Sequence, residues 1–152
     1  MKSYQQLVDE YAKNIKESFP WDINNLQQDF KLIIDVREAE EFKVMRIKNS
    51  INIPRGVLEM ACEWNYEHTF PELVKARSCS ILVVCRSGHR SVFAVNRMQQ
   101  LGYKDVSSLK LGLRGWFEFD QELVDDNNVT VDEIEADNYF ASHVSEEQLS
   151  PR

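Results

Sequence analysis

The sequence has no excess of basic side chains and no long hydrophobic run, and each absence excludes a class of protein. Lysine and arginine together number 18, against 25 aspartates and glutamates, which gives a net charge of −7. That balance argues against a protein that binds nucleic acid or an anionic membrane through its overall charge. The longest aliphatic stretch, Ile81 to Val84, is far too short to span a membrane.

Cysteine is also scarce. The chain has three, at positions 62, 79 and 85, and they form no CxxC pair. The first 20 residues carry acidic side chains and lack the apolar segment of a signal peptide. An odd number of cysteines without a signal peptide predicts free thiols in the reducing cytoplasm. The order Cys62, His68, Cys79, Cys85 matches no common zinc-ligand spacing, so these residues do not suggest a zinc site. The sequence implies no other metal and no organic cofactor.

Charge is spread unevenly over the 152 residues, a length that predicts one domain. The segment 125–152 carries the whole negative excess, so the rest of the chain is neutral and can hold a basic pocket. We divide the chain into an amphipathic N-terminal helix extension (1–20), a folded domain (21–124) and this acidic C-terminal extension. The extension has one apolar and aromatic cluster, Ile134 to Phe140, and we expect it to be solvated and packed only lightly, through Tyr139 and Phe140.

Short aliphatic segments alternate with amphipathic ones along the chain. The aliphatic segments predict strands at residues 31–36, 50–53, 80–84 and 105–109. Apolar spacing, with glycine and proline as end signals, predicts helical segments at residues 3–17, 24–28, 38–43, 56–62, 71–76, 91–101 and 115–122. Continuous apolar strand centres indicate burial on both faces. The pattern predicts an α/β fold with a mainly parallel central sheet flanked by helices on both faces.

The segment most informative about chemistry runs from Cys85 to Ser91 and reads CRSGHRS. It follows a predicted buried strand and precedes a predicted helix, which is where open parallel sheets bind ligands. The backbone N–H groups of such a loop can converge as a nest, and the helix adds the positive end of its dipole, so that a thiolate is stabilised. Gly88 permits the positive φ that tight curvature requires.

The side chains of this loop suit an anionic substrate. Two arginines and a histidine make its rim cationic, and Ser91 can cap the helix or bond the sulfur. His89 is either an exposed loop residue or a proton carrier. The predicted substrate-binding residues are Arg86, Ser87, Gly88, His89, Arg90 and Ser91. An inert cysteine that ends a core strand is the alternative, which the glycine, arginines and serine at this spacing disfavour.

The loop length distinguishes between chemistries. Four residues separate Cys85 from Arg90. Phosphatases with a cysteine nucleophile have five at this point, because their loop must wrap a tetrahedral phosphate. The shorter loop makes a narrower cradle, which suits one terminal sulfur atom on the cysteine. An arsenate reductase or phosphatase is therefore the weaker alternative.

Four segments in this order resemble the motifs of the rhodanese family of sulfurtransferases, and the resemblance extends from about Ile23 to Leu123. They are Ile33–Glu38 with Glu41–Phe42, Ser50–Pro54, Cys85–Ser91 and Leu109–Trp116. The third is similar to the family's six-residue active-site loop. The resemblance implies a rhodanese-like fold. It also implies that Cys85 accepts sulfane sulfur from a donor, forms a persulfide and passes the sulfur to a nucleophile.

The sequence departs from the family's pattern at two places, and both look like packing or turn positions. Met45-Arg46-Ile47 stands where the family often has Gly-His-Ile, and Arg46 could alter the surface near the site. Leu111-Gly112 stands where the family often has paired glycines before the last helix.

These observations predict a thiosulfate sulfurtransferase-like enzyme that moves sulfane sulfur from an anionic donor such as thiosulfate to a thiol or cyanide. The alternative is a sulfur carrier that docks a protein partner of a sulfur relay, with the acidic tail as docking element. Asp35, Arg37 and Arg55 follow predicted strands and are supporting candidates, which either orient loops or contact substrate. Cys62 is a candidate resolving thiol only if the loop around it folds over the edge of the sheet.

Overall fold

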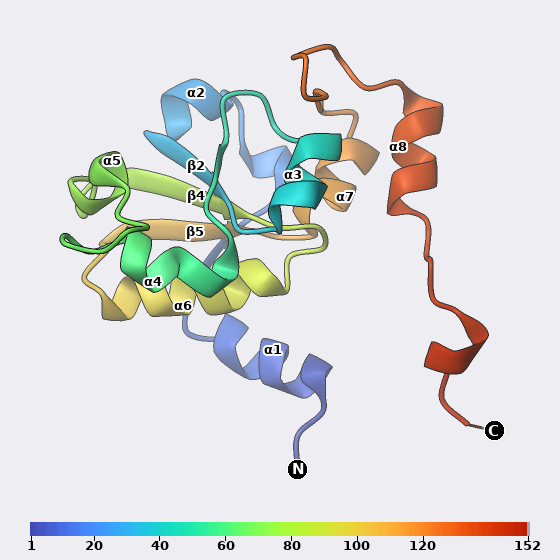
Figure 1. Cartoon of the computed structure of the whole chain (residues 1–152), viewed down its shortest axis with the longest axis horizontal. Helices are drawn as coiled ribbons and strands as arrows, with labels where there is room; N and C mark the ends of the chain where they lie inside the picture. Colours follow the sequence, from blue (N-terminus) through green and yellow to red (C-terminus); the bar gives the residue numbers. More distant parts are fainter. Residues whose placement is uncertain (152) are drawn as a thin grey trace.

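The short apolar segments pair side by side as one five-stranded sheet in the computed structural model, which describes residues 1–151 (Figure 1). Every pair of strands is parallel, and the order across the sheet is β1-β5-β4-β2-β3. The strands are β1 (Lys16–Ser18), β2 (Leu32–Asp35), β3 (Ile51–Asn52), β4 (Ser80–Val84) and β5 (Asp105–Leu109). The predicted α/β fold with a parallel central sheet is confirmed.

Strands β2 and β4 contain the continuous apolar runs Leu32–Ile34 and Ile81–Val84, because their alternate residues face two different cores. Ile34 lies opposite Val83 and faces one core. Ile33 lies opposite Leu82 and faces the other. A strand with helices over both faces has no solvated side, which explains why polar residues do not alternate with apolar ones.

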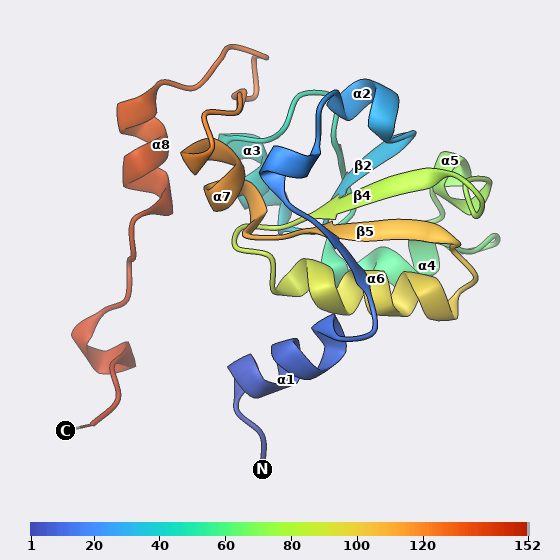
Figure 2. The same ribbon diagram turned by 180° about the vertical axis from the view of Figure 1, so that it is seen from behind.

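Helices cover both faces of the sheet. On one face lie α4, α5 and α6, with α1 packed outside α6; on the other lie α2, α3 and α7, with α8 outside α7 (Figures 1 and 2). The helices are α1 (Tyr4–Ala12), α2 (Leu26–Asp29), α3 (Ala39–Val44), α4 (Leu58–Ala61), α5 (Pro71–Val74), α6 (Arg90–Gln100), α7 (Gly112–Glu118) and α8 (Glu133–Phe140). Single 3₁₀ turns span Pro20–Asp22, Arg55–Val57 and Glu146–Gln148. No helix within residues 1–151 is long and apolar enough to cross a membrane.

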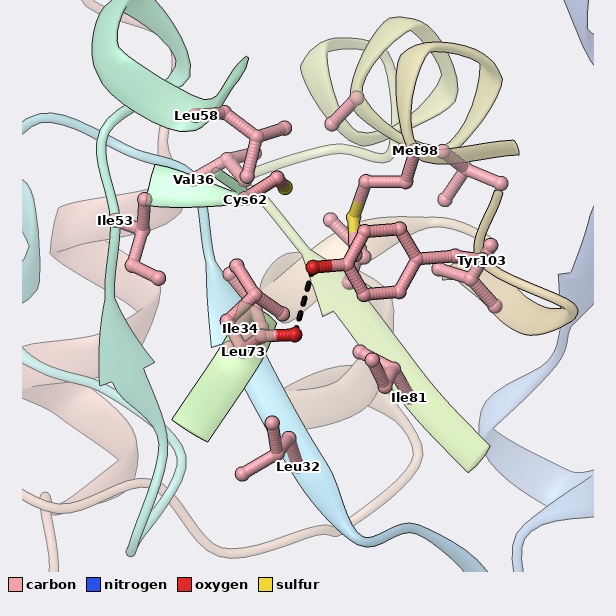
Figure 3. Close-up of a cluster of buried hydrophobic side chains, with 14 of the residues drawn as sticks. Leu32, Ile34, Val36, Ile53, Leu58, Cys62, Leu73, Ile81, Met98 and Tyr103 are labelled. Atoms are coloured by element: carbon pink, nitrogen blue, oxygen red, sulfur yellow. Dashed lines mark hydrogen bonds between the residues drawn. The ribbon is translucent and has the colours of Figure 1, made fainter. Parts of the chain in front are cut away.

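The core between the sheet and α6 is packed around Tyr103 (Figure 3). The Tyr103 hydroxyl donates a hydrogen bond to the carbonyl oxygen of Leu73, with an oxygen–oxygen distance of 2.7 Å. Burial raises the pKa of Tyr103 far above its usual value. The hydroxyl therefore stays neutral, and its bond satisfies a polar group inside an apolar cluster.

Two predicted helices have different limits. The helix predicted for residues 3–17 ends at Ala12, and Lys16–Ser18 forms the edge strand β1, paired with Ser107–Leu109 of β5. This pairing satisfies backbone groups of β5 that an edge strand would leave exposed, a long-range gain that local apolar spacing does not reveal. The helix predicted for residues 115–122 begins earlier, at Gly112, and ends at Glu118.

The C-terminal extension is only partly solvated, which differs from our expectation. Ala136 and Phe140 of α8 are buried and join the core on the α7 side of the sheet. Asp132 caps this helix, because its carboxylate accepts a hydrogen bond from the N–H of Glu135 at 2.8 Å. Two apolar side chains thus anchor an otherwise acidic segment to the domain.

Candidate active site

The sulfur of Cys85 lies inside the loop that connects β4 to α6. Its Sγ atom accepts hydrogen bonds from the N–H groups of Gly88 at 3.1 Å and Ser91 at 3.4 Å. The Ser91 hydroxyl oxygen is 3.3 Å from Sγ and 2.7 Å from the hydroxyl of Ser108 on β5. Backbone donors at the start of a helix are oriented to stabilise negative charge on sulfur. Cys85, Gly88 and Ser91 are thus the predicted site residues that the fold brings together.

Two glycines set the shape of this loop. Gly88 has a φ of 87°, a left-handed conformation that side chains with a β-carbon rarely adopt. Gly112, at the start of α7, has a φ of 62°. A β-carbon on Gly112 would come within 2.5 Å of the Arg86 carbonyl and 2.6 Å of the Ser87 nitrogen. The turn before α7 therefore packs directly against the backbone of the loop.

Hydrogen bonds join the same two segments. The N–H groups of Leu113 and Arg114 donate to the carbonyl oxygens of Cys85 at 2.9 Å and Arg86 at 3.0 Å. The first N–H groups of α7, which have no partner within the helix, are satisfied in this way. Leu111, where the family pattern has a glycine, adopts a left-handed φ of 71°. Leu111 and Gly112 are thus turn and packing positions.

Arg90 of α6 forms an ion pair with a glutamate of α3, on the other face of the sheet. Its Nη1 and Nη2 atoms donate to the two carboxylate oxygens of Glu41 on α3, at 2.6 and 2.9 Å. Burial acts to raise the pKa of Glu41, but the hydrogen bonds and charge of Arg90 outweigh it and hold that pKa below its usual value. The predicted substrate-binding arginine therefore ties α6 to α3.

Asp35 and Arg37 form a fully buried ion pair at the end of β2. The Arg37 Nη2 atom lies 2.9 Å from Asp35 Oδ2, and Nε lies 3.0 Å from Oδ1. Arg37 also donates to the carbonyl oxygen of Met45 at 2.6 Å and to the Tyr139 hydroxyl at 3.3 Å. The pair has no exposed surface and contacts only protein groups, which is the geometry expected of the first of the two predicted roles. Arg55, the third supporting candidate, pairs with Glu59 at 2.7 Å.

Arg86 points toward the C-terminal extension. Its Nη2 atom donates to the last carbonyl oxygens of α8 and the residue after it, those of Tyr139 at 3.4 Å, Phe140 at 3.1 Å and Ala141 at 3.2 Å. Ser87, in contrast, is exposed to solvent. Sequence reasoning did not foresee the contact with α8, since the only sign of it was the aromatic cluster in an acidic tail.

His89 is covered by the N-terminal helix. The rings of His89 and Tyr4 meet edge to face with centroids 5.5 Å apart, and the Tyr4 ring also stacks on Phe93 of α6 at 6.5 Å. Burial raises the pKa of Tyr4; a negative charge on Cys85 raises it further, and Arg90 lowers it. The Tyr4 ring of α1 thus packs on His89 of the active-site loop, a contact that the sequence did not predict.

The other two cysteines are not part of the active-site loop. Cys62 is fully buried in the core around Tyr103, and burial raises the pKa of its thiol (Figure 3). A neutral, enclosed thiol is unsuited to resolve a persulfide. Cys79 lies before β4, at the opposite end of that strand from Cys85. No group of three or more His, Cys, Asp or Glu side chains in residues 1–151 could hold a metal ion.

Comparison with known proteins decides the family, because the sequence model of the rhodanese-like domain matches residues 20–119. The chain belongs to the rhodanese-like family. All four motifs of this rhodanese-like domain lie within the matched residues. Helices α1 and α8, which contact the active-site loop from outside, do not.

Two curated proteins and one solved structure are similar to this rhodanese-like domain. A candidate mitochondrial thiosulfate sulfurtransferase of Schizosaccharomyces pombe is 33% identical over 95 residues, which cover 60% of this chain and 65% of that one. A candidate sulfur carrier protein of Bacillus subtilis, YrkF, is 32% identical over 55% of this chain and 40% of its own. The crystal structure of a rhodanese-related protein from Thermoplasma volcanium superimposes with a TM-score of 0.59 and 27% identity, covering 72% of this chain and 97% of that one. The chain thus spans less than two thirds of either curated relative.

Proposed function

We propose that this protein transfers sulfane sulfur through a persulfide on Cys85, from an anionic donor such as thiosulfate to a thiol or cyanide. The observation that carries the proposal is the Cys85 sulfur at the carboxyl end of β4, with the N–H groups of Gly88 and Ser91 directed at it. These donors also suit the terminal sulfur of a persulfide, which is negatively charged. Membership of the family supports sulfur transfer in general.

The transfer has two balanced steps. In the first, the Cys85 thiolate attacks the outer sulfur of thiosulfate. The sulfur–sulfur bond of the donor breaks, sulfite leaves with the bonding electron pair, and a Cys85 persulfide anion remains. In the second, an acceptor thiolate or cyanide attacks the outer persulfide sulfur and releases the Cys85 thiolate. This is nucleophilic catalysis through a covalent intermediate, and neither step needs a metal or an external oxidant.

Mass spectrometry of the intact protein after incubation with thiosulfate tests the proposal. We expect a mass increase of one sulfur atom that disappears on addition of cyanide or a thiol. The adduct should be absent from Cys85→Ser and present in the matched control Cys79→Ser. If no sulfane donor, including an organic persulfide, produces an adduct on the wild type, the proposal is wrong.

A sulfur carrier that receives its sulfur from a protein partner is the second candidate, favoured by the similarity to YrkF. Removal of residues 142–152, of which 142–151 are described and exposed, separates the two candidates. A carrier that docks through this segment loses transfer to or from its partner and keeps persulfide formation with small donors. An enzyme acting on small molecules keeps its turnover rate at saturating donor concentration.

A further inference from the structure

We propose that helix α8 is a positioning element of the active site. Its last carbonyl groups hold the Arg86 guanidinium beside the Cys85 loop, where this cation binds the anionic part of the sulfur donor. The proposal rests on the proposed function and assigns a role to a segment outside the matched residues 20–119. In both views of the fold α8 lies along α7, next to the end of the sheet where β4 enters the loop (Figures 1 and 2).

The contact between Arg86 and α8 is well matched in charge. The last carbonyl groups of a helix have no partner within the helix and carry the negative end of its dipole. Nη2 of Arg86 lies within 3.1 to 3.4 Å of three such oxygens, from Tyr139 to Ala141. A long and flexible side chain therefore has one defined position.

This contact leaves most of the guanidinium available. Arginine has five N–H donors, of which Nε and Nη1 carry three. Neither atom of Arg86 has a hydrogen-bond partner within residues 1–151, and no carboxylate of that range pairs with its charge. Arg37 and Arg90, in contrast, are neutralised by Asp35 and Glu41. Arg86 is therefore the arginine of this region that can pair with a donor anion.

A groove of about 640 Å³ adjoins Arg86. Glu41 of α3, Arg114 of α7 and the segment after α8 line its other sides. Sites for small ligands range from roughly 300 to 1,000 Å³. Glu41 is already paired with Arg90, so Arg86 gives this groove a positive end.

Contacts that do not involve Arg86 fix the position of α8. Phe140 is buried and its ring stacks on that of Phe117 of α7, with centroids 6.3 Å apart. The Tyr139 hydroxyl accepts a hydrogen bond from Arg37 at 3.3 Å. Because α8 is anchored independently of Arg86, the helix places the arginine and not the reverse.

A double-mutant cycle tests this assignment. Arg86→Ala should raise the KM for thiosulfate about tenfold, in line with the loss of a charge-assisted hydrogen bond. Phe140→Ala, which loosens α8, should raise this KM several-fold in the wild-type background and have no further effect in Arg86→Ala. Neither change should alter kcat or the rate at which neutral iodoacetamide alkylates Cys85 more than about twofold.

Two further variants keep the test decisive. Phe140→Leu preserves an apolar side chain in the core and serves where Phe140→Ala does not fold. Ile134→Ala, on the exposed side of α8, is the matched control and should leave the KM unchanged.

The possible results are distinguishable. Equal effects of the Phe140 change in both backgrounds would overturn the assignment, and a fall in KM would show that α8 withholds Arg86 instead. If the effects of the two changes on KM are additive and the Cys85 persulfide still forms normally, only the role of α8 is contradicted. The absence of a persulfide with every donor overturns the proposed function and this inference together.

Discussion

At the scale of single residues, the two glycines at positions 88 and 112 matter because they allow two backbone segments to touch. Gly88 turns the chain back over the Cys85 sulfur, and its N–H reaches that atom. Gly112 leaves room for the Arg86 carbonyl where any other residue would place a carbon atom. The geometry around the sulfur thus depends on groups that have no side chain.

Gly112→Ala tests this dependence. The added β-carbon meets backbone atoms, which cannot move aside as a flexible side chain can, and it must also adopt a positive φ. We expect a loss of about 2–4 kcal/mol in the free energy of unfolding, together with slower persulfide formation. Urea denaturation and the mass assay measure the two effects.

Gly56→Ala is the matched control, because nothing lies within 4 Å of its added β-carbon. It should change the stability by no more than about 0.5 kcal/mol. Equal unfolding free energies for Gly112→Ala and Gly56→Ala would contradict this. They would show that the turn at Gly112 can move away from the active-site loop without loss of stability.

The same scale shows what sequence can reveal about a site. Cys85, Gly88 and Ser91 could be identified because they lie within seven consecutive positions, which set their geometry. The partner of Arg86 could not, because it lies more than 50 positions away and its contact is with main-chain carbonyls. Carbonyl groups are present in every residue, so no residue type marks them.

At the scale of elements, the pair formed by Glu41 and Arg90 joins helices on opposite faces of the sheet. It links α3 to the first turn of α6, directly beside the loop. Four of the five strands and most helices could be predicted, since their apolar periodicity is local. The edge strand β1 could not, because its three residues gain their structure only from pairing with β5.

This pair makes stability depend on pH. The pKa of Glu41 is lower in the folded chain than the ordinary value of 4.5. Its contribution is therefore complete above about pH 5 and is lost as the pH falls through the lowered folded pKa. Glu41→Gln should remove this part of the acid sensitivity, so the difference in unfolding free energy between wild type and variant should shrink below about pH 4. Urea titrations between about pH 3 and 6 measure it, and parallel curves would contradict the assignment.

At the scale of the whole molecule, the C-terminal extension divides into a packed and a solvated part. Ala136 and Phe140 belong to the core, while residues 141 to 151 are exposed. Composition alone marked the whole segment as acidic and therefore solvated. The aromatic cluster predicted light packing through Tyr139 and Phe140, but not that Ala136 and Phe140 of α8 are buried in the core that contains Trp116.

Truncations separate the two parts. A chain that ends after Ala141 keeps α8 and should unfold at the wild-type urea concentration. A chain that ends after residue 131 leaves the sites of Ala136 and Phe140 open and should lose about 3 kcal/mol or more, as for a buried phenylalanine removed from a core. Equal midpoints for these two chains would show that α8 contributes nothing to the fold.

The bonds from the first amides of α7 to the carbonyls of Cys85 and Arg86 have a consequence for how the molecule opens. A loop that closes its own hydrogen bonds can fluctuate alone, but this one shares them with a helix packed on the sheet through buried Leu113 and Trp116. The loop Cys85–Ser91 can therefore open around the Cys85 sulfur only if the start of α7 detaches from it. Such a detachment would disrupt α7 packing and would be part of a large, cooperative unfolding event. We expect the Leu113 and Arg114 amides to exchange with deuterium as slowly as those of β4. Fast exchange at these two amides would instead show that the active-site loop opens independently of the rest of the fold. The loop could then admit bulky acceptors without unfolding of the domain.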